Sequence, residues 1–311
     1  MTRALAIAAP AQSYLVGCLL VLLAGLVLSL GILCIRGATA SDAWQYLFWR
    51  SLAFGGVIAL VTARRHGTRA LAQIGRLGGF AWVSVLALVA SQICFVAAVK
   101  SGSTAEVFFL LSLAPLMTAL LARPLLGERV GRIGMLAIAV ALGGVALMSG
   151  LNLGGGMHVE MPEGAWLAWV LALGAALSFA LYSLATRGAR TEDLEAALVA
   201  VGIVTALCSA LALHWLDLPF AAGARDVALA LLHGGVILAA GFVLFARGSR
   251  LVQGVTLVML VQTETVAAPI WTYLFLDETT TLPVIAGGAL ILVAVVLQAS
   301  AGAGRKADAA A

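Results

Sequence analysis

The segment AGLVLSLGILCIRG, residues 24–37, is an apolar run that returns in altered form as AALSFALYSLATRG, residues 175–188. At an offset of 151 the two segments share Ala24/Ala175, Leu26/Leu177, Leu30/Leu181, Leu33/Leu184, Arg36/Arg187 and Gly37/Gly188. A second pair of landmarks, Gly127-Glu128 and Asp277-Glu278, lies between apolar runs at an offset of 150. Self-similarity at one fixed offset indicates an internal repeat, so the chain is expected to contain two copies of one unit.

The composition around this repeat is that of a membrane protein. Of the 311 residues, 63% are apolar and 10% are charged, whereas a soluble domain is about a quarter charged. A membrane helix needs about 20 apolar residues. The chain offers ten such runs, at residues 13–35, 43–63, 78–99, 103–122, 131–149, 164–186, 194–216, 226–246, 251–276 and 281–300. This pattern excludes a soluble enzyme, a disordered chain and a secreted disulfide-rich domain.

Five spans per copy is an odd number, so the second copy must cross the membrane upside down. The distribution of Lys and Arg agrees with this topology. With a cytoplasmic N-terminus, 14 of the 18 basic residues fall on the cytoplasmic side, 3 (Arg36, Lys100 and Arg225) fall outside, and Arg50 lies within the second span. Positive charge accumulates on the cytoplasmic side of membrane proteins. Both termini and the loop of residues 64–77 are therefore predicted to be cytoplasmic.

The predicted fold is an all-α polytopic membrane protein of ten transmembrane helices. They form two inverted five-helix repeats, residues 1–150 and residues 164–311, around a central cavity. Inverted repeats are a transporter architecture, with the binding site near the midplane between the halves.

Several segments resemble a known family. They are Trp49-Arg50, the stretch LSLAPLMTALLARPLLGER at residues 111–129, residues 174–187 and the stretch GGALILVAVVL at residues 287–297. They resemble the drug/metabolite transporter superfamily and its ten-span EamA members, and the chain as a whole also resembles amino-acid exporters of the YddG type. The resemblance implies a cavity between spans one, three and four of one half and six, eight and nine of the other, with spans five and ten at the periphery.

Two prolines are candidate helix breaks. Pro115 lies in span four and Pro269 in span nine, and a mid-helix proline removes one backbone hydrogen bond. Paired broken helices in the two halves of a transporter mark its transport site. The alternative is a packing kink without a role in transport.

Polar residues within the spans are candidates for substrate binding. Glu264 is the strongest of these candidates, because a carboxylate at membrane depth must face protein or water. It could exchange a proton or meet a substrate ammonium group, or it could be held neutral by helix–helix hydrogen bonds. The predicted substrate-binding set is Glu264, Gln262, Tyr182, Trp169, His233 and Gln92. For Trp169 and Tyr182 the alternative is packing, and for His233 it is a hydrogen-bonded helix contact.

Arg50 and Glu106 lie at similar depth on the outer side. We expect a structural pair between them, with capture of a substrate carboxylate by Arg50 as the alternative.

These features favour a secondary transporter that exports amino acids, including aromatic and neutral ones, or related metabolites across the inner membrane by alternating access. A carrier of drugs, sugars or nucleotide-sugars is the alternative, and a membrane-embedded enzyme is a second one. The sequence contains no GxxxxGK[ST] motif for ATP binding, no converging catalytic residues and no metal-ligand pattern. We expect no cofactor and no nucleic-acid partner. The partners are a small-molecule substrate and the lipid bilayer, and a monomer is expected, with a dimer as the alternative.

Overall fold

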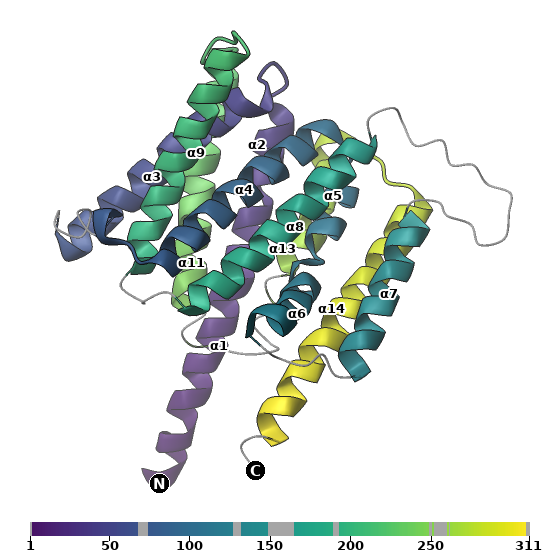
Figure 1. The fold of residues 1–311 in the computed structure, drawn as a ribbon. Coiled ribbons are helices and arrows are strands. Elements are labelled where there is room, and N and C mark those ends of the chain that lie inside the picture. The colour runs from purple at the N-terminus through teal and green to yellow at the C-terminus, as the bar shows by residue number, and fades with distance from the viewer. Residues whose placement is uncertain are drawn as a thin grey trace, which may run out of the picture.

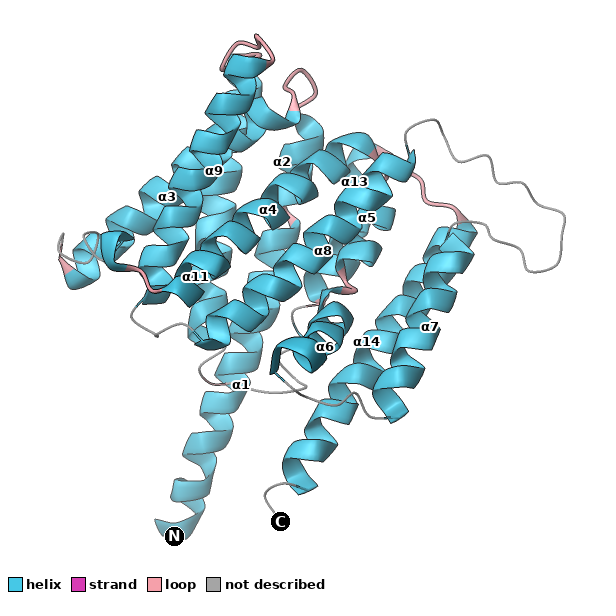
Figure 2. Ribbon diagram, in the orientation of Figure 1, coloured by secondary structure: helices cyan, strands magenta, loops and turns pink. Residues whose placement is uncertain are grey.

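The structure, a computed structural model, describes residues 2–67, 74–126, 132–148, 165–188, 193–248, 251, 260 and 262–308. All regular structure in these ranges is helical (Figure 2). Seven segments are long and apolar enough to cross a membrane: residues 14–37, 43–65, 79–101, 104–121, 166–186, 195–215 and 224–245. Two shorter apolar stretches, residues 132–147 and 282–297, follow the same pattern. The expected ninth span, residues 251–276, lies partly outside the described residues.

In the described part of the first half the chain forms seven α-helices. They are α1 (Thr2–Ser29), α2 (Gly31–Gly37), α3 (Ala43–His66), α4 (Gly79–Ser101), α5 (Thr104–Leu111), α6 (Ala114–Leu126) and α7 (Arg132–Met148). A polar turn precedes α3, and its side chains cap the start of this helix. Asp42 accepts a hydrogen bond from the Trp44 backbone N–H, and the Gln45 side chain accepts one from the Asp42 backbone N–H. Such a capping box satisfies amide groups that the first helical turn leaves unpaired.

The second half contains α8 (Ala165–Gly188), α9 (Asp193–Trp215), α10 (Ala224–Leu232), the π-helix η2 (His233–Leu238), α11 (Ala239–Gly248), α13 (Thr263–Leu276) and α14 (Leu282–Asp308). The helices α10, η2 and α11 follow one another without a break in the chain and together form one span. A π-helical turn inside an α-helix is uncommon and frequently lies at a functional site.

The bundle has two distinguishable ends. The start of α1 and the end of α14 lie at one end (Figure 1). We call the opposite end the distal end; the connections from α2 to α3, from α4 to α5 and from α13 to α14 lie there. It corresponds to the side that the charge distribution predicts to be outside the cell.

Helix pairing follows a two-fold pattern. The helices α3 and α9 pack together, as do α7 and α14, and α5 packs against α13. The pair α4 and α8 has its counterpart in the pair α1 and α11. Three pairs of equivalent spans therefore pack together, and the unlike pair α4 and α8 occurs a second time as α1 and α11, as expected for two repeats related by a two-fold axis. The pair α7 and α14 lies at the edge of the bundle (Figure 1).

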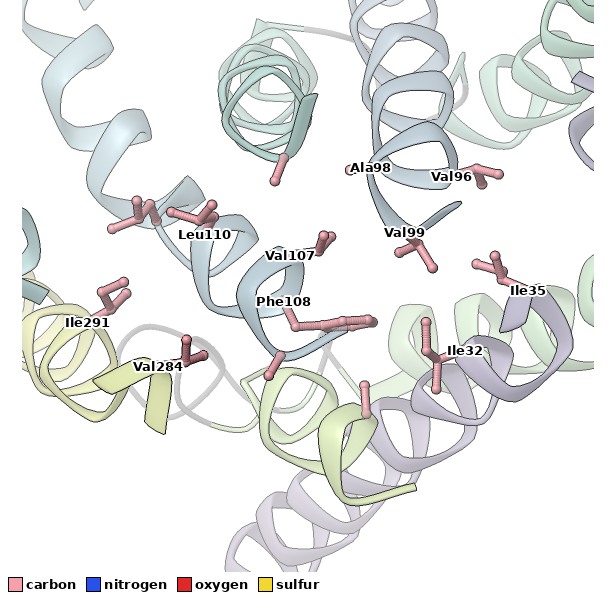
Figure 3. Packing of buried hydrophobic residues seen from close by; sticks show 14 of the residues in the cluster. Ile32, Ile35, Val96, Ala98, Val99, Val107, Phe108, Leu110, Val284 and Ile291 are labelled. Atoms are coloured by element: carbon pink, nitrogen blue, oxygen red, sulfur yellow. The ribbon is translucent and has the colours of Figure 1, made fainter. Parts of the chain in front are cut away.

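The largest buried cluster joins both halves in the distal part of the molecule. Ile32 and Ile35 on α2, Phe108 on α5 and Ile291 on α14 are each 2% exposed or less (Figure 3). Elsewhere large apolar side chains face outward. Leu19, Leu142 and Leu211 are more than 60% exposed, and such contiguous apolar surface indicates contact with lipid.

Candidate functional site

An ion pair joins the two halves at the distal end. Arg36, at the end of α2, places Nη2 3.0 Å from Oε1 of Glu278, in the connection between α13 and α14. Glu278 also accepts hydrogen bonds from the backbone N–H and the hydroxyl of Thr104, at 2.6 and 2.7 Å. The Thr104 hydroxyl accepts in turn from Arg36 Nε at 3.0 Å, and the Gly102 carbonyl accepts from Arg36 Nη2. Arg36, Thr104 and Glu278 form what we call the distal latch.

A second set of polar contacts holds the turn between α2 and α3. Asp226, in the first turn of α10, accepts from the backbone N–H groups of Ala40 and Ser41, at 2.9 and 2.7 Å. Lys100, at the end of α4, donates to the carbonyls of Ala38 and Ser41. This turn is therefore bonded to both halves of the molecule.

A cavity of about 580 Å³ opens beside this turn. Residues of four elements line it: Ile35 and Arg36; Asp42, Trp44 and Leu47; Ile93, Ala97 and Lys100; and Leu167 and Leu171. Both of its cations are occupied, because Arg36 bonds Glu278 and Lys100 bonds backbone carbonyls. The cavity lies between α2, α3, α4 and α8.

Arg50 lies one helical turn beyond Leu47 on α3 and is 2% exposed. Its Nη2 donates a hydrogen bond to Oε1 of Gln92 on α4, and its Nε is buried without a hydrogen-bond partner. Gln92 is next to Ile93, which lines the cavity, and is partly exposed. The structure thus places two of the candidate residues together, near the residues Leu47 and Ile93 that line the cavity.

The expected pair of Arg50 and Glu106 does not form. Glu106 on α5 instead accepts a hydrogen bond from Trp169 Nε1 on α8, at 3.0 Å, so each residue has a different partner. Sequence position gives the depth of a residue in the membrane, but not the direction that its side chain takes around the helix. Trp169, a candidate for substrate stacking, is thereby bonded across the two halves.

His233 begins the π-helix and is 4% exposed. Its Nδ1 lies 2.8 Å from the Tyr46 hydroxyl on α3. Its imidazole also packs against Gly31, the first residue of α2, where a Cβ would collide with the ring. The interruption of span one at Leu30 and the π-helix of span eight therefore meet at this histidine.

Glu264 lies in the first turn of α13, where span nine is interrupted. Gln262 precedes this helix, and its Nε2 is buried without a hydrogen-bond partner. A Cβ on Gly25 of α1 would lie 3.1 Å from Thr263 Cβ and 3.3 Å from the Glu264 backbone nitrogen. The start of α13 therefore packs directly against the backbone of α1, which places Glu264 at the boundary between the two halves.

The interruptions of the helices lie at equivalent positions of the two repeats, whereas the two prolines do not. Span four is interrupted at Ser112–Leu113, just before Pro115. In span nine α13 continues through Pro269, so the expected break there is wrong. The interruption lies at Gln262, which is 150 residues after Ser112 and therefore at the equivalent position of the repeat.

Tyr182 is separate from the other candidates. Its ring packs against Phe179 with 5.6 Å between centroids, and its side chain contacts the buried cluster of α4 and α9. The structure brings Arg50, Gln92, Tyr46 and His233 to one region and leaves Glu264 and Gln262 at a second one. In the described residues no three His, Cys, Asp or Glu side chains gather in a way that could hold a metal ion.

Sequence reasoning missed the roles of Thr104, Asp226, Lys100 and the ion pair. Arg36 and Glu278 were both visible as landmarks of the repeat, and their charges at predicted span ends were the available signal. The ion pair depends on residues 242 positions apart, and nothing in the local sequence pattern joins them.

Comparison with known proteins gives one family and one fold. The family model of the EamA-like transporter family matches residues 15–150 and 166–299. A solved structure titled "Crystal structure of protein" is similar with a TM-score of 0.61 and 19% identity, over 92% of this chain and 96% of that chain. A search among curated proteins gave no match. At that identity the solved structure supports the fold alone.

Proposed function

Since the chain belongs to the EamA-like transporter family, we propose that it is a secondary transporter that exports amino acids or related small carboxylates across the inner membrane. It works by alternating access, with both termini in the cytoplasm. The membership makes it a multi-pass membrane transporter and not an enzyme. The solute, the direction and the orientation are our proposal.

One observation supports the mechanism above all others. The interruptions at Ser112–Leu113 and at Gln262 lie at equivalent positions of the two repeats, and the helices that they border, α5 and α13, pack together. A broken helix exposes backbone groups at membrane depth, which is tolerated where they line a cavity or are buried in protein. Discontinuous helices at a repeat interface are the usual site of substrate binding in such transporters.

The distal latch supports the alternating part of the proposal. It connects α2 and α5 of the first half to the α13–α14 connection of the second half. Rocking of the halves must break these bonds when the distal end opens, and must restore them when it closes. In the described arrangement the distal latch is formed.

The size and lining of the site favour small solutes with few charges. A nucleotide-sugar needs several free cations for its phosphates, and Arg36 and Lys100 are already bonded to protein groups. Among the described residues this leaves Arg50 as the buried cation with an unpartnered donor. The one carboxylate of an amino acid would balance the one positive charge of Arg50.

Counterflow in proteoliposomes tests the proposal. Vesicles preloaded with unlabelled phenylalanine should transiently accumulate labelled phenylalanine without ATP or an ion gradient, and vesicles preloaded with glucose should not. Protein-free vesicles are the control. Counterflow of a sugar but of no amino acid would contradict the proposed solute, and the absence of counterflow across a panel of amino acids, sugars and organic cations would contradict the transporter mechanism.

A further inference from the structure

Arg50 is a buried cation for which the structure provides no counter-charge. It is 2% exposed, and its recorded hydrogen bond goes to the neutral amide of Gln92. Burial of an ionised side chain is strongly unfavourable unless the charge is paired and hydrogen-bonded. An arginine remains protonated under these conditions, because its guanidinium is not deprotonated in proteins. The charge therefore has to be balanced by something other than these groups.

The carboxylates of the distal half are engaged elsewhere. Glu106 bonds Trp169, Asp226 bonds the backbone of Ala40 and Ser41, and Glu278 bonds Arg36 and Thr104. Asp42 caps α3. The exposed carboxylates Asp217 and Asp277 lie in connections at the distal end. None of these groups forms an ion pair with Arg50 in the described residues.

The donors of Arg50 match one carboxylate. A guanidinium presents N–H groups in a fixed planar fork that binds both oxygens of a carboxylate at once. The Arg50 Nη2 is held by Gln92, and the Nε–H is buried without a partner. Gln92 thus helps to fix the plane of the guanidinium, while the Nε–H has no hydrogen-bond partner.

The surroundings of Arg50 combine a nearby cavity with a rigid frame. Leu47 lies three residues before Arg50, about 4.5 Å along α3, and it lines the distal cavity together with Ile93, the neighbour of Gln92. On the other side the backbone of Arg50 is in close contact with Gly234 of the π-helix, where a Cβ would collide with the Arg50 carbonyl. A π-helical turn and a buried, uncompensated cation meet here, one helical turn from Leu47, which lines the cavity.

We propose that the guanidinium of Arg50, positioned by Gln92, binds the carboxylate of the solute that this protein carries. This rests on the proposed function and specifies which part of the solute is recognised and where. Solutes that carry a carboxylate should bind more tightly than the same molecules with a neutral amide in its place.

Binding of matched acids and amides to the purified protein is the direct test. The probes are phenylalanine with phenylalaninamide and leucine with leucinamide, and the readout is ligand-dependent thermal stabilisation in detergent. The wild type should bind each acid at least tenfold more tightly than its amide. In Arg50→Gln this preference should disappear, because affinity for the acid falls while affinity for the amide stays within about twofold.

Gln92→Glu provides a second variant that keeps the arginine. The new carboxylate supplies the missing counter-charge next to Arg50, so the protein should fold at least as stably as the wild type and lose affinity for the acid by tenfold or more. If Arg50→Gln fails to fold, the affinity of Gln92→Glu for the acids is sufficient to test the role of Arg50. Arg36→Gln is the matched control, because it removes a guanidinium that is already paired, and the ratio of acid to amide affinity should stay as in the wild type.

Two results would overturn the inference. One is a wild type that prefers no acid over its amide, and the other is a Gln92→Glu protein that binds the acids as well as the wild type does. Counterflow distinguishes failure of the inference about Arg50 from failure of the proposed function. Transport of amides or sugars without a carboxylate preference would retain the transporter and reject the role of Arg50. Arg50-dependent binding of acids without any counterflow would retain the site and reject transport of amino acids.

Discussion

Arg36 and Glu278 are 242 residues apart in the sequence and form an ion pair of 3.0 Å at the distal end of the bundle. Thr104 lies between them, accepting from Arg36 and donating to Glu278. The ion pair connects the segment that matches the family model at residues 15–150 with the one at residues 166–299. Any motion that separates the two halves at this end must break it.

Removal of the Glu278 charge should favour opening of the distal end. The reporter is Ala38→Cys in a cysteine-less background, because Ala38 lines the distal cavity and is 0% exposed. A hydrogen bond to a charged group contributes about 1.5 kcal/mol, so Glu278→Gln should raise the rate of maleimide labelling at this cysteine by roughly tenfold. The control is Asp277→Asn, a neighbouring exposed carboxylate with a φ of 52° that asparagine also tolerates. Equal labelling rates in Glu278→Gln and Asp277→Asn would show that the ion pair does not hold the distal end closed.

Hydropathy predicted an all-helical membrane protein, and seven of the ten expected spans are long and apolar enough to cross a membrane in the described residues, because span length and apolar composition are set by the bilayer itself. The multi-pass, all-helical architecture is confirmed by the described residues and by the family match. The break of span nine lies at Gln262, at the repeat-equivalent position of Ser112, whereas the prediction from the sequence had assigned it to Pro269. A proline removes one hydrogen bond, and α13 continues in spite of that loss.

The arrangement of charged residues was harder to predict. Arg50 and Glu106 have similar depth, but α3 directs Arg50 toward α4, and α5 directs Glu106 toward α8. Rotation about a helix axis decides such contacts, and a helix that is apolar on all sides carries no periodic signal for its rotation. For the same reason the neighbours of Gly25 and Gly234 are known only from the structure.

Gly234→Ala should be far more destabilising than Gly235→Ala. A Cβ on Gly234 would overlap the backbone carbonyl of Arg50, which cannot move aside as a flexible side chain could. On Gly235 the nearest atom would be Ala53 Cβ at 3.5 Å, an ordinary contact. Overpacking of this kind costs about 1–3 kcal/mol, which should lower the unfolding temperature in detergent by several degrees. Equal unfolding temperatures would mean that the π-helix does not pack against α3 as described.

Labelling from the two sides of the membrane should give opposite results at Arg65 and Asp217. Both residues are exposed and lie near opposite ends of the bundle. The charge distribution puts Asp217 outside, so Asp217→Cys should react with an impermeant maleimide in intact cells. Arg65→Cys should react only after permeabilisation. The reverse pattern would invert the proposed topology.

A larger residue at position 25 should impair transport more than it impairs folding. In the described arrangement α1 approaches the start of α13 at Gly25, with 3.1 Å between the position of a Cβ and Thr263 Cβ. Gly25→Val would push the two helices apart at the interruption of span nine, and the counterflow rate should fall by about tenfold or more. Gly143→Val is the matched control in α7, because a Cβ on Gly143 meets nothing within 4 Å. Similar rates in the two variants would show that close approach of α1 to α13 is not required.

Glu264→Gln should reduce transport while leaving insertion and folding intact. Glu264 lies in the first turn of α13, with its backbone nitrogen in the contact with Gly25, and its side chain forms no hydrogen bond or ion pair within the described residues. A carboxylate at membrane depth is retained where it has a function. If the carboxyl exchanges a proton or meets a substrate ammonium group, glutamine cannot replace it, because the amide does not titrate and carries no charge.

The measurement is counterflow at two pH values, with protein amounts matched and thermal stability recorded for each variant. The rate of Glu264→Gln should fall by about tenfold or more, and any pH dependence of the wild type should disappear with it. Asp217→Asn, an exposed carboxylate in the connection between α9 and α10, should behave as the wild type does. A Glu264→Gln rate equal to that of the wild type at both pH values would make Glu264 a structural residue, because glutamine preserves its shape and much of its hydrogen bonding. The binding region would then be confined to the surroundings of Arg50, and α13 would serve transport only through its packing against α1.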